Sequence, residues 1–234
     1  MSLSRSVVHG SMSCALGLEA DLRRELLQLT CQPVACAVEL IDRDEGLFPE
    51  EMSVVRNAAW KRRAEFAAGR SAARRALGQM SVPDQAIPKG NFGEPIWPTG
   101  YGGSISHDDP FAAAIVHPIK ASTSALSIDL IDTSDLARYW EVSHLVRAAG
   151  EPSEITSDPR SAALLFGAKE AAIKLISPRA QCYVGFERLV ATRTNRGFKI
   201  RCAYTNTCIL VRVFESNGII VSLGVLDCQG SPVG

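Results

Sequence analysis

Several features are missing from this sequence, and each absence excludes a class of protein. No apolar run approaches the roughly 18 residues of a transmembrane helix, and residues 1–10 lack the apolar core of a secretory signal peptide. Basic and acidic residues are equal at 25 each, so the formal net charge is zero. We therefore expect a cytoplasmic protein that binds neither bulk nucleic acid nor a membrane. We also expect it to be a monomer.

The cysteine pattern excludes a further class. Seven cysteines occupy positions 14, 31, 36, 182, 202, 208 and 228, and no two of them form a Cys-x-x-Cys pair. Their odd number argues against a complete disulfide framework. We expect most of them to be small buried apolar residues in a reducing compartment.

Three short segments carry side chains suited to binding a phosphate and a metal ion. Gly102-Gly103-Ser104-Ile105-Ser106-His107 combines glycines, which let the backbone approach an anion, with a hydroxyl and an imidazole that can donate hydrogen bonds. The apolar run over 125–132 predicts a buried strand that delivers the carboxylate of Asp129, a suitable ligand for a hard cation. The third segment is a cluster of charges on a predicted helix: Lys169, Glu170 and Lys174.

Each of these signals also has an ordinary interpretation. His107 could cap a turn together with Asp108. Glu170 and Lys174 are four residues apart, so on a helix they could form a common surface ion pair.

A predicted helix over 49–77 is unusually basic. Its basic residues are Arg56, Lys61, Arg62, Arg63, Arg70, Arg74 and Arg75, and the acid among them is Glu65. Arg62 and Arg70 are about 80° apart around a helix, so their long side chains could reach one phosphate. The alternative is a solvated helix face. A nucleic-acid interface would need interleaved aromatic residues or a recognisable module, and neither is present.

The chain divides into two halves of similar content, residues 1–120 and 121–234, joined near residues 119–124. Hydrophobic periodicity and the positions of proline and glycine predict the elements of the first half. These are a helix over 16–29, a strand over 35–41, the basic helix, a Pro/Gly-rich loop over 83–103 that leads into the Gly-Ser-Ile-Ser-His loop, and a strand over 111–116.

The second half contains the same kinds of element. We expect a strand over 125–131, a helical stretch over 136–149, a polar loop over 151–159, and a helix over 161–176 that Pro178 stops. Two hairpins should follow, one pairing 186–192 with 198–204 and the other pairing 208–214 with 219–226. Asn217-Gly218 is a strong turn signal for the second hairpin.

Four motifs in order resemble the 4'-phosphopantetheinyl transferases of the surfactin/enterobactin-synthetase type. They are Lys61-Arg62-Arg63-Ala64-Glu65-Phe66-Ala67-Ala68-Gly69-Arg70, then Pro95-Ile96-Trp97-Pro98 leading into Gly103-Ser104-Ile105-Ser106-His107, then Ile128-Asp129, and finally Phe166-Gly167-Ala168-Lys169-Glu170-Ala171-Ala172-Ile173-Lys174. Their span covers about half of the chain. The resemblance implies an α+β fold, built as a pseudo-twofold pair of similar halves with the active site in the cleft between them.

The resemblance also implies a reaction. Such an enzyme moves the phosphopantetheine arm of coenzyme A onto a serine of an apo acyl or peptidyl carrier protein, requires Mg²⁺, and releases 3',5'-adenosine bisphosphate. Nonribosomal peptide synthetases, including those that make siderophores, are the expected carriers. Asp129 and Glu170 would bind Mg²⁺, and Lys174 would neutralise the pyrophosphate. Glu170 is the preferred general base and Lys169 the alternative. The expected contacts to coenzyme A are Lys61, Arg62, Arg70, Lys89, Ser106 and His107.

One departure from the family pattern concerns the metal site. Two residues after the metal-binding aspartate the family usually has another acid, but this chain has Ile131, followed by Asp132. Successive side chains on a strand point to opposite faces, so Asp132 cannot replace that acid without a bulge. A water could fill the position. The alternative function is therefore a coenzyme-A-binding protein without transferase activity.

Overall fold

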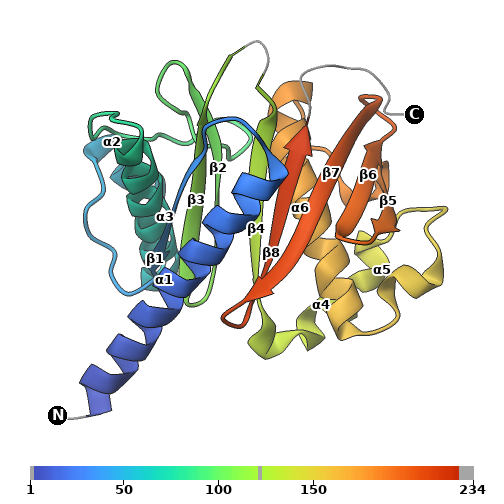
Figure 1. The fold of residues 1–234 in the computed structure, drawn as a ribbon, viewed down its shortest axis with the longest axis horizontal. Helices are drawn as coiled ribbons and strands as arrows, with labels where there is room; N and C mark the ends of the chain where they lie inside the picture. Colours follow the sequence, from blue (N-terminus) through green and yellow to red (C-terminus); the bar gives the residue numbers. More distant parts are fainter. Residues whose placement is uncertain (1–2, 121–122, 227–234) are drawn as a thin grey trace.

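The protein combines helices with two antiparallel sheets, which confirms the predicted α+β class (Figure 1). The computed structural model describes residues 3–120 and 123–226. Residues 121 and 122, at the predicted boundary between the halves, lie outside the described residues, as do 227–234 of the predicted second half. In the described part of the chain, no helix is both long and apolar enough to cross a membrane.

The first sheet has the strand order β1-β3-β2, and helix α3 packs against it. The elements of this part are α1 (Leu3–Leu29), β1 (Ala35–Leu40), α2 (Pro49–Val55), α3 (Trp60–Gln79), β2 (Tyr101–Asp108) and β3 (Phe111–Pro118). The helix meets the sheet mainly through small side chains: Ala72, Ala73 and Ala76 of α3 pack with Ala35, Ala37 and Ala114 of the strands. Because alanine is small, the helix can pack closely and in a defined position against the sheet.

The second sheet has the order β4-β8-β7-β6-β5, and helix α6 covers one of its faces. Its strands are β4 (Ala125–Asp132), β5 (Leu189–Thr194), β6 (Gly197–Cys202), β7 (Thr207–Ser216) and β8 (Ile219–Leu226). The helices of this part are η1 (Thr133–Asp135), α4 (Ala137–Glu141), α5 (Ser143–Val146), η2 (Ser153–Thr156), α6 (Pro159–Ala180) and η3 (Phe186–Arg188).

Helix α1 connects the two sheets (Figure 1). Leu18, Leu22 and Leu26 belong to one apolar cluster together with Val38 of β1 and Val221 of β8. The chain passes from one sheet to the other between β3 and β4, near the predicted boundary, but this shared core crosses it. The sheets have three and five strands, so the division into two domains and their pseudo-twofold relation stay predictions.

The prediction of one helix over 49–77 was wrong, because this segment forms two helices, α2 and α3. Residues 56–59 break it, and the backbone at Ala59 is extended. The break lets α2 fold back so that Glu51 accepts hydrogen bonds from Arg74 at 2.8 and 2.9 Å. In one straight helix these two residues would be about 35 Å apart. The sequence contains no proline or glycine at the break, so the tertiary ion pair stabilises it without a local signal.

The Gly-Ser-Ile-Ser-His segment is a strand and not a loop. It forms part of β2, which pairs antiparallel with β3 along its whole length. A Cβ at Gly103 would clash with the carbonyl oxygen of Ile115 and would lie 2.9 Å from the ring of Trp97. Glycine is therefore needed here for close packing, and Trp97 donates a hydrogen bond to the Gly103 carbonyl at 3.1 Å. From the sequence, the glycines of this segment are expected to let a loop approach an anion. Gly103 instead lets the strand pack closely against Ile115 and Trp97.

Other predicted boundaries also moved. Pro178 does not stop α6, which continues to Ala180 and ends at Gln181, a residue with a φ of 52°. A proline in the last turn removes only one hydrogen bond, and the left-handed residue ends the helix. The stretch over 136–149 forms the two short helices α4 and α5. Both predicted hairpins are present, and Asn217 and Gly218 have φ values of 51° and 77°, as their turn requires.

The cysteine prediction was correct about bonding and wrong about burial. The six cysteines among the described residues are free, and Cys228 lies outside the described residues. Only Cys36 and Cys202 of those six are buried, while Cys31 and Cys208 are exposed.

Candidate active site

The three predicted segments meet where the two sheets adjoin. Strands β2 and β4 belong to different sheets, and side chains of β2 accept backbone hydrogen bonds from β4. The hydroxyl of Ser106 accepts from the Leu130 amide at 3.1 Å, and the carboxylate of Asp108 accepts from the Asp132 amide at 2.7 Å. These contacts hold the strand that carries Ser106 and His107 beside the strand that carries Asp129.

Ser106, Asp129 and Lys174 form one hydrogen-bonded cluster. Lys174 on α6 donates to Asp129 Oδ1 at 2.7 Å, to Ser106 Oγ at 3.0 Å and to the Ile128 carbonyl at 2.9 Å. Ser106 also donates to Asp129 Oδ1 at 3.0 Å. Because Lys174 pairs with Asp129, the ordinary interpretation of a Glu170–Lys174 surface pair is wrong. Residues far apart in the sequence thus form a polar junction between β2, β4 and α6.

Glu170 provides a second carboxylate next to this junction. Burial, and then the negative charge of Asp129, raise the pKa of Glu170 from 4.5 to about 7, and the nearby Lys174 opposes this only partly. Two carboxylates that disfavour each other's charge can be neutralised by a hard divalent cation. Among the described residues, no group of three or more acids, histidines and cysteines is arranged to hold a metal. The two carboxylates of Asp129 and Glu170 are nevertheless oxygen donors of the kind that Mg²⁺ prefers, so their chemistry fits that ion.

Ile131 lies on the same face of β4 as Asp129 but in an apolar environment. It is buried in a cluster with Tyr139, Ala162, Ala163 and Ile220. Asp132 is used elsewhere, since its carboxylate accepts a hydrogen bond from the Ser134 amide at 3.1 Å and caps η1. The structure therefore agrees with the strand argument: Asp132 does not take the place of the acid that Ile131 replaces.

A cavity of about 470 Å³ lies beside the junction and is lined by residues of both predicted halves. One wall comes from residues 92–97 and from β2, and the other from α6 and the residues that follow it. Glu170 and Lys174 line this cavity. Its charged side chains are the cations Lys120, Lys174 and Arg179 and the acids Glu94 and Glu170, so cations outnumber acids and the cavity is compatible with an anionic ligand.

Arg62 and His107 are in direct contact. An Arg62 N–H donates to His107 Nε2 at 2.8 Å, and the other ring nitrogen lies 3.8 Å from Glu65. Accepting from a guanidinium requires a neutral imidazole. Accordingly, burial and then the cations of Arg62 and Lys174 lower the pKa of His107, against the charge of Glu65. Two residues expected to contact coenzyme A therefore lie side by side, and the turn-cap interpretation of His107 does not describe its contacts.

None of the expected contacts to coenzyme A, all of which are described residues, lines the cavity itself, and three of them have surroundings of their own. Lys61 pairs with Asp109 at 3.0 Å. Arg70 is buried, donates to the Ile87 carbonyl at 2.7 Å and stacks over Phe66, and burial lowers its pKa to about 10. Lys89 is exposed and lies beside the cavity, because it lines an adjoining hollow together with Phe92, Gly93 and Tyr183, which also line the cavity. Arg62 and Arg70 therefore meet different surroundings and do not converge on one phosphate.

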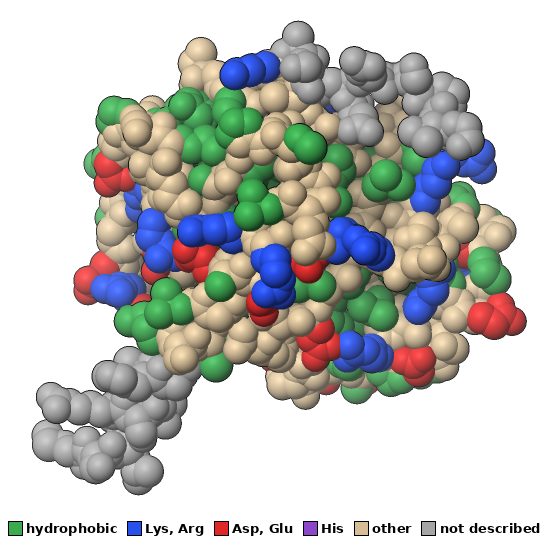
Figure 2. All heavy atoms as spheres, in the orientation of Figure 1, with side chains coloured by type: hydrophobic (Ala, Val, Ile, Leu, Met, Phe, Trp, Pro, Cys, Tyr) green, Lys and Arg blue, Asp and Glu red, His purple; other side chains and the backbone are tan. Residues whose placement is uncertain are grey.

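The basic run on α3 does not form a free positive face. Its partners come from other elements: Lys61 with Asp109, Arg63 with Asp44, Arg74 with Glu51, and Arg75 with Glu19 and Glu39. On the face drawn in Figure 2, basic and acidic side chains likewise lie next to one another. The missed signal was the set of acids that lie before residue 56 and after residue 75, since the zero net charge of the chain requires as many acids as basic residues.

Lys169 points away from the predicted site. It is fully buried and donates to Glu151 at 2.8 Å and to the carbonyl of Val146 at 2.8 Å. Glu151 in turn accepts from the amides of Ala148 and Ala191. On a helix, adjacent residues point about 100° apart, so Lys169 faces the core when Glu170 faces the cavity. This placement favours a structural role for Lys169, and Glu151 was not found from the sequence.

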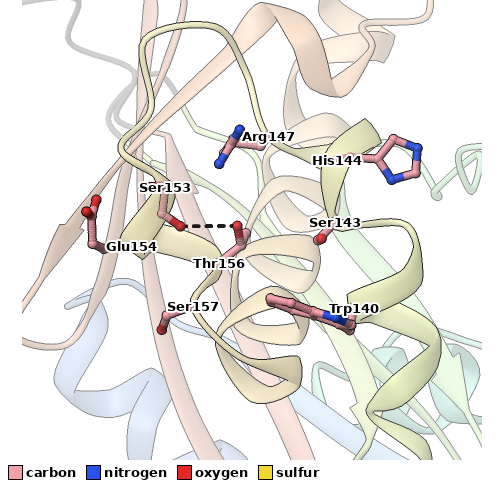
Figure 3. Close-up of a pocket in the computed structure, with 8 residues that line it drawn as sticks. All are labelled: Trp140, Ser143, His144, Arg147, Ser153, Glu154, Thr156 and Ser157. Atoms are coloured by element: carbon pink, nitrogen blue, oxygen red, sulfur yellow. Dashed lines mark hydrogen bonds between the residues drawn. The ribbon is translucent and has the colours of Figure 1, made fainter.

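A second hollow, of about 460 Å³, lies between α4, α5 and η2 (Figure 3). Its side chains are mixed in character: Trp140, Ser143, His144, Arg147, Ser153, Glu154, Thr156 and Ser157. None of the predicted site residues, all of which the structure describes, lines it. It is therefore not the site that the three segments form.

The chain is similar in sequence to known 4'-phosphopantetheinyl transferases. A model of the family "4'-phosphopantetheinyl transferase N-terminal domain" matches residues 50–117. The 4'-phosphopantetheinyl transferase PptT of Mycobacterium tuberculosis is 37% identical over 158 residues, which are 64% of this chain and 67% of the relative. The 4'-phosphopantetheinyl transferase Npt of Nocardia iowensis is 34% identical over 64% of this chain and 69% of the relative. Enterobactin synthase component D of Salmonella typhi is 31% identical over 60% and 59%. The chain belongs to the 4'-phosphopantetheinyl transferase family.

Proposed function

We propose that the protein transfers the 4'-phosphopantetheine group of coenzyme A to a serine of an apo acyl or peptidyl carrier protein, with Mg²⁺, and releases 3',5'-adenosine bisphosphate. The observation that carries this proposal is the junction of Ser106, Asp129 and Lys174, which lies beside an anion-compatible cavity also lined by Glu170. The carrier serine forms a bond to the β-phosphorus, and the bond from that phosphorus to the bridging oxygen breaks.

The binding of coenzyme A is assigned to the cavity and to the adjoining end of β2. Lys174 supplies positive charge for the pyrophosphate, and its contacts with Asp129 and Ser106 hold it in place. Arg62 and His107 are proposed to bind the nucleotide phosphate, since they present adjacent polar groups at the C-terminal end of β2. Lys61 and Arg70 are weaker candidates because their side chains contact Asp109 and the Ile87 carbonyl, whereas Lys89 stays a candidate because it lies beside the cavity.

Proton transfer is assigned to Glu170, whose carboxyl group lines the cavity that the carrier serine must approach. Burial and then the charge of Asp129 raise the pKa of Glu170 to about 7 in the absence of a cation, and a cation held by the same carboxylate would keep it deprotonated, as a general base must be. Lys169 is less suitable, because it is buried and held by Glu151.

Asp129 and Glu170 would hold Mg²⁺, which would stabilise negative charge on the pyrophosphate oxygens. Mg²⁺ is usually bound by one or two protein carboxylates together with substrate phosphates and waters, so two acids suffice. The alternative, a coenzyme-A-binding protein without transferase activity, rests on Ile131 alone.

The relatives suggest a class of carrier. One of them is named enterobactin synthase component D, so carriers of siderophore or other nonribosomal peptide synthesis are proposed as substrates. The cytoplasmic location and the monomeric state stay predictions.

Intact-mass analysis tests the proposal. Apo carrier proteins of several classes are incubated with the enzyme, coenzyme A and Mg²⁺, and the expected result is a gain of one phosphopantetheine group. No gain with any carrier, together with tight binding of coenzyme A in titration calorimetry, would favour the alternative. Coenzyme A affinity that does not depend on Mg²⁺ would count against the metal site.

A further inference from the structure

The side chain of Ser222 on β8 is unusual because its hydroxyl makes no hydrogen bond to any described residue. The residue is 1% exposed, and its Oγ is buried without a partner in the part of the chain that the structure describes. An unsatisfied buried hydroxyl normally destabilises a fold, so such groups need an explanation. Packing alone does not explain a serine at this position.

Ser222 lies directly beside the proposed metal ligand. In the antiparallel pairing of β4 and β8, Ser222 is opposite Asp129, and both side chains lie next to Gly167 of α6. The alternate residues of β4, among them Ile128, face the other way into the cluster that includes α1. Ser127 shares the face of Asp129, and its hydroxyl donates to the Ala171 carbonyl of α6 at 2.6 Å. This face of the sheet thus carries one satisfied serine and one unsatisfied serine.

Gly167 on α6 leaves space between these groups. A Cβ built at Gly167 would lie 3.1 Å from Ser222 Oγ, 3.5 Å from Asp129 Oδ2 and 2.9 Å from Ile131 Cδ1. The hydrogen bonds that Asp129 accepts from Ser106 and Lys174 both use Oδ1, so Oδ2 is the oxygen on the Ser222 side. The unsatisfied hydroxyl therefore lies at the edge of the proposed metal site, next to the isoleucine that stands where the family usually has an acid.

We propose that Ser222 is a positioning residue of the metal centre, whose hydroxyl would donate a hydrogen bond on the Oδ2 side of the Asp129 carboxylate, to the carboxylate or to a water beside it, when a cation is bound. This inference rests on the proposed function, because it assumes that Asp129 binds a cation. A hydroxyl that orients a metal-binding carboxylate can be retained for that function, although it makes no hydrogen bond within the described part of the chain. It also supplies a polar group close to Ile131, where the usual acid is missing.

Metal binding by matched serine variants tests the inference. Binding of Mn²⁺ in the presence of coenzyme A is measured by electron paramagnetic resonance for the wild type, Ser222→Ala, Ser222→Thr and Ser127→Ala. Loss of a group that orients a ligand typically weakens metal binding about 10- to 100-fold, so we expect at least about a tenfold loss for Ser222→Ala and recovery in Ser222→Thr. Ser127→Ala should bind Mn²⁺ like the wild type.

Thermal unfolding of the metal-free proteins separates this role from a structural one. Ser222→Ala should unfold at the same temperature as the wild type or a higher one, because it removes an unsatisfied group, whereas Ser127→Ala should unfold at a lower temperature. Wild-type Mn²⁺ affinity in Ser222→Ala would overturn the inference. Equal Mn²⁺ binding by the wild type and Asp129→Asn would show that the proposed metal site itself is wrong. Reduced binding in Asp129→Asn but not in Ser222→Ala would overturn only the role of Ser222.

Discussion

At the scale of single residues, the candidate site depends on charges that are paired across the junction of the two sheets. Asp129 is balanced by Lys174 and oriented by Ser106. Glu170 is not held in this way, and burial together with the nearby Asp129 raises its pKa to about 7. One acid is thus fixed by two hydrogen-bond donors, and the other is a buried carboxyl group whose pKa is raised in the absence of a cation.

Asp129→Asn and Glu170→Gln should each remove most of the transfer activity while the fold is retained. Each change removes one charged oxygen ligand of the proposed Mg²⁺ site, and a loss of roughly 100-fold or more in turnover is expected. Turnover is measured on an apo carrier at limiting Mg²⁺. Asp135→Asn, in the exposed η1, is the control and should be fully active. Near-normal turnover in either site variant would refute the metal assignment.

The Glu170→Gln variant should also change how stability depends on pH. The folded protein holds the Glu170 proton more tightly than the unfolded chain, since its pKa is about 7 instead of 4.5. This contribution to stability is complete below the unfolded pKa and is lost as the pH rises through the folded one. Without metal, the variant should gain stability relative to the wild type between about pH 5 and 8, by about 1–2 kcal/mol after allowance for solvent screening. Urea unfolding of both proteins at about pH 5 and about pH 8 measures this. The same difference in the free energy of unfolding between variant and wild type at both pH values would contradict the prediction.

Arg62→Ala and His107→Ala should weaken coenzyme A much more than dephospho-coenzyme A. Both residues are proposed to contact the 3'-phosphate, which the second ligand lacks. A charge-assisted contact is worth about 1.5–3 kcal/mol, so the dissociation constant should rise roughly 10- to 100-fold. Titration calorimetry measures both ligands. Arg63→Ala is the matched control, because Arg63 lies next to Arg62 but pairs with Asp44. Equal losses for the two ligands would move the contact to the pyrophosphate.

At the scale of elements, helix α6 places three charged residues in three environments. Lys169 lies in the core, Glu170 lines the cavity, and Lys174 reaches Asp129. The helical period separates their directions, and the sheet on one side and the cavity on the other determine what each one meets. The sequence of this helix shows that the three charges are close together. It does not show that Lys169 pairs with Glu151 while Lys174 pairs with Asp129.

Lys169→Met should destabilise the fold instead of removing the chemistry. Its partner Glu151 is fully buried at the side chain and would be left as an unpaired charge, which typically costs about 3–5 kcal/mol. Urea unfolding measures this, with Lys199→Met on the exposed face of β6 as the control. At a temperature where the variant is folded, it should retain turnover. A folded but inactive variant would restore Lys169 as a candidate base.

At the scale of the whole molecule, α1 packs against both sheets, so we expect the two sheets to unfold together. Leu22 is 1% exposed in the cluster that includes residues of both sheets, whereas Leu27 of the same helix is 77% exposed. Leu22→Ala should cost about 2–5 kcal/mol, and Leu27→Ala should cost little. Thermal unfolding of both variants should show one transition. Two separate transitions in the Leu22 variant would mean that the halves unfold independently.

The family resemblance of the sequence implied the α+β class, and the sequence by itself determined most strands, the second hairpin and the short segments that form the site. These depend on local information: hydrophobic periodicity, the Asn217-Gly218 turn, and a lone acid at the end of an apolar run. The sequence also placed Ile131 and Asp132 on opposite faces, because strand side chains alternate.

Only the tertiary structure decided which of the candidate residues come together. The break between α2 and α3 is stabilised by the pair of Glu51 and Arg74, and the burial of Lys169 depends on Glu151. The use of β2 as a strand depends on the close packing of Gly103. Each of these contacts joins residues distant in the chain, so its energy depends on three-dimensional proximity, which local sequence patterns do not encode.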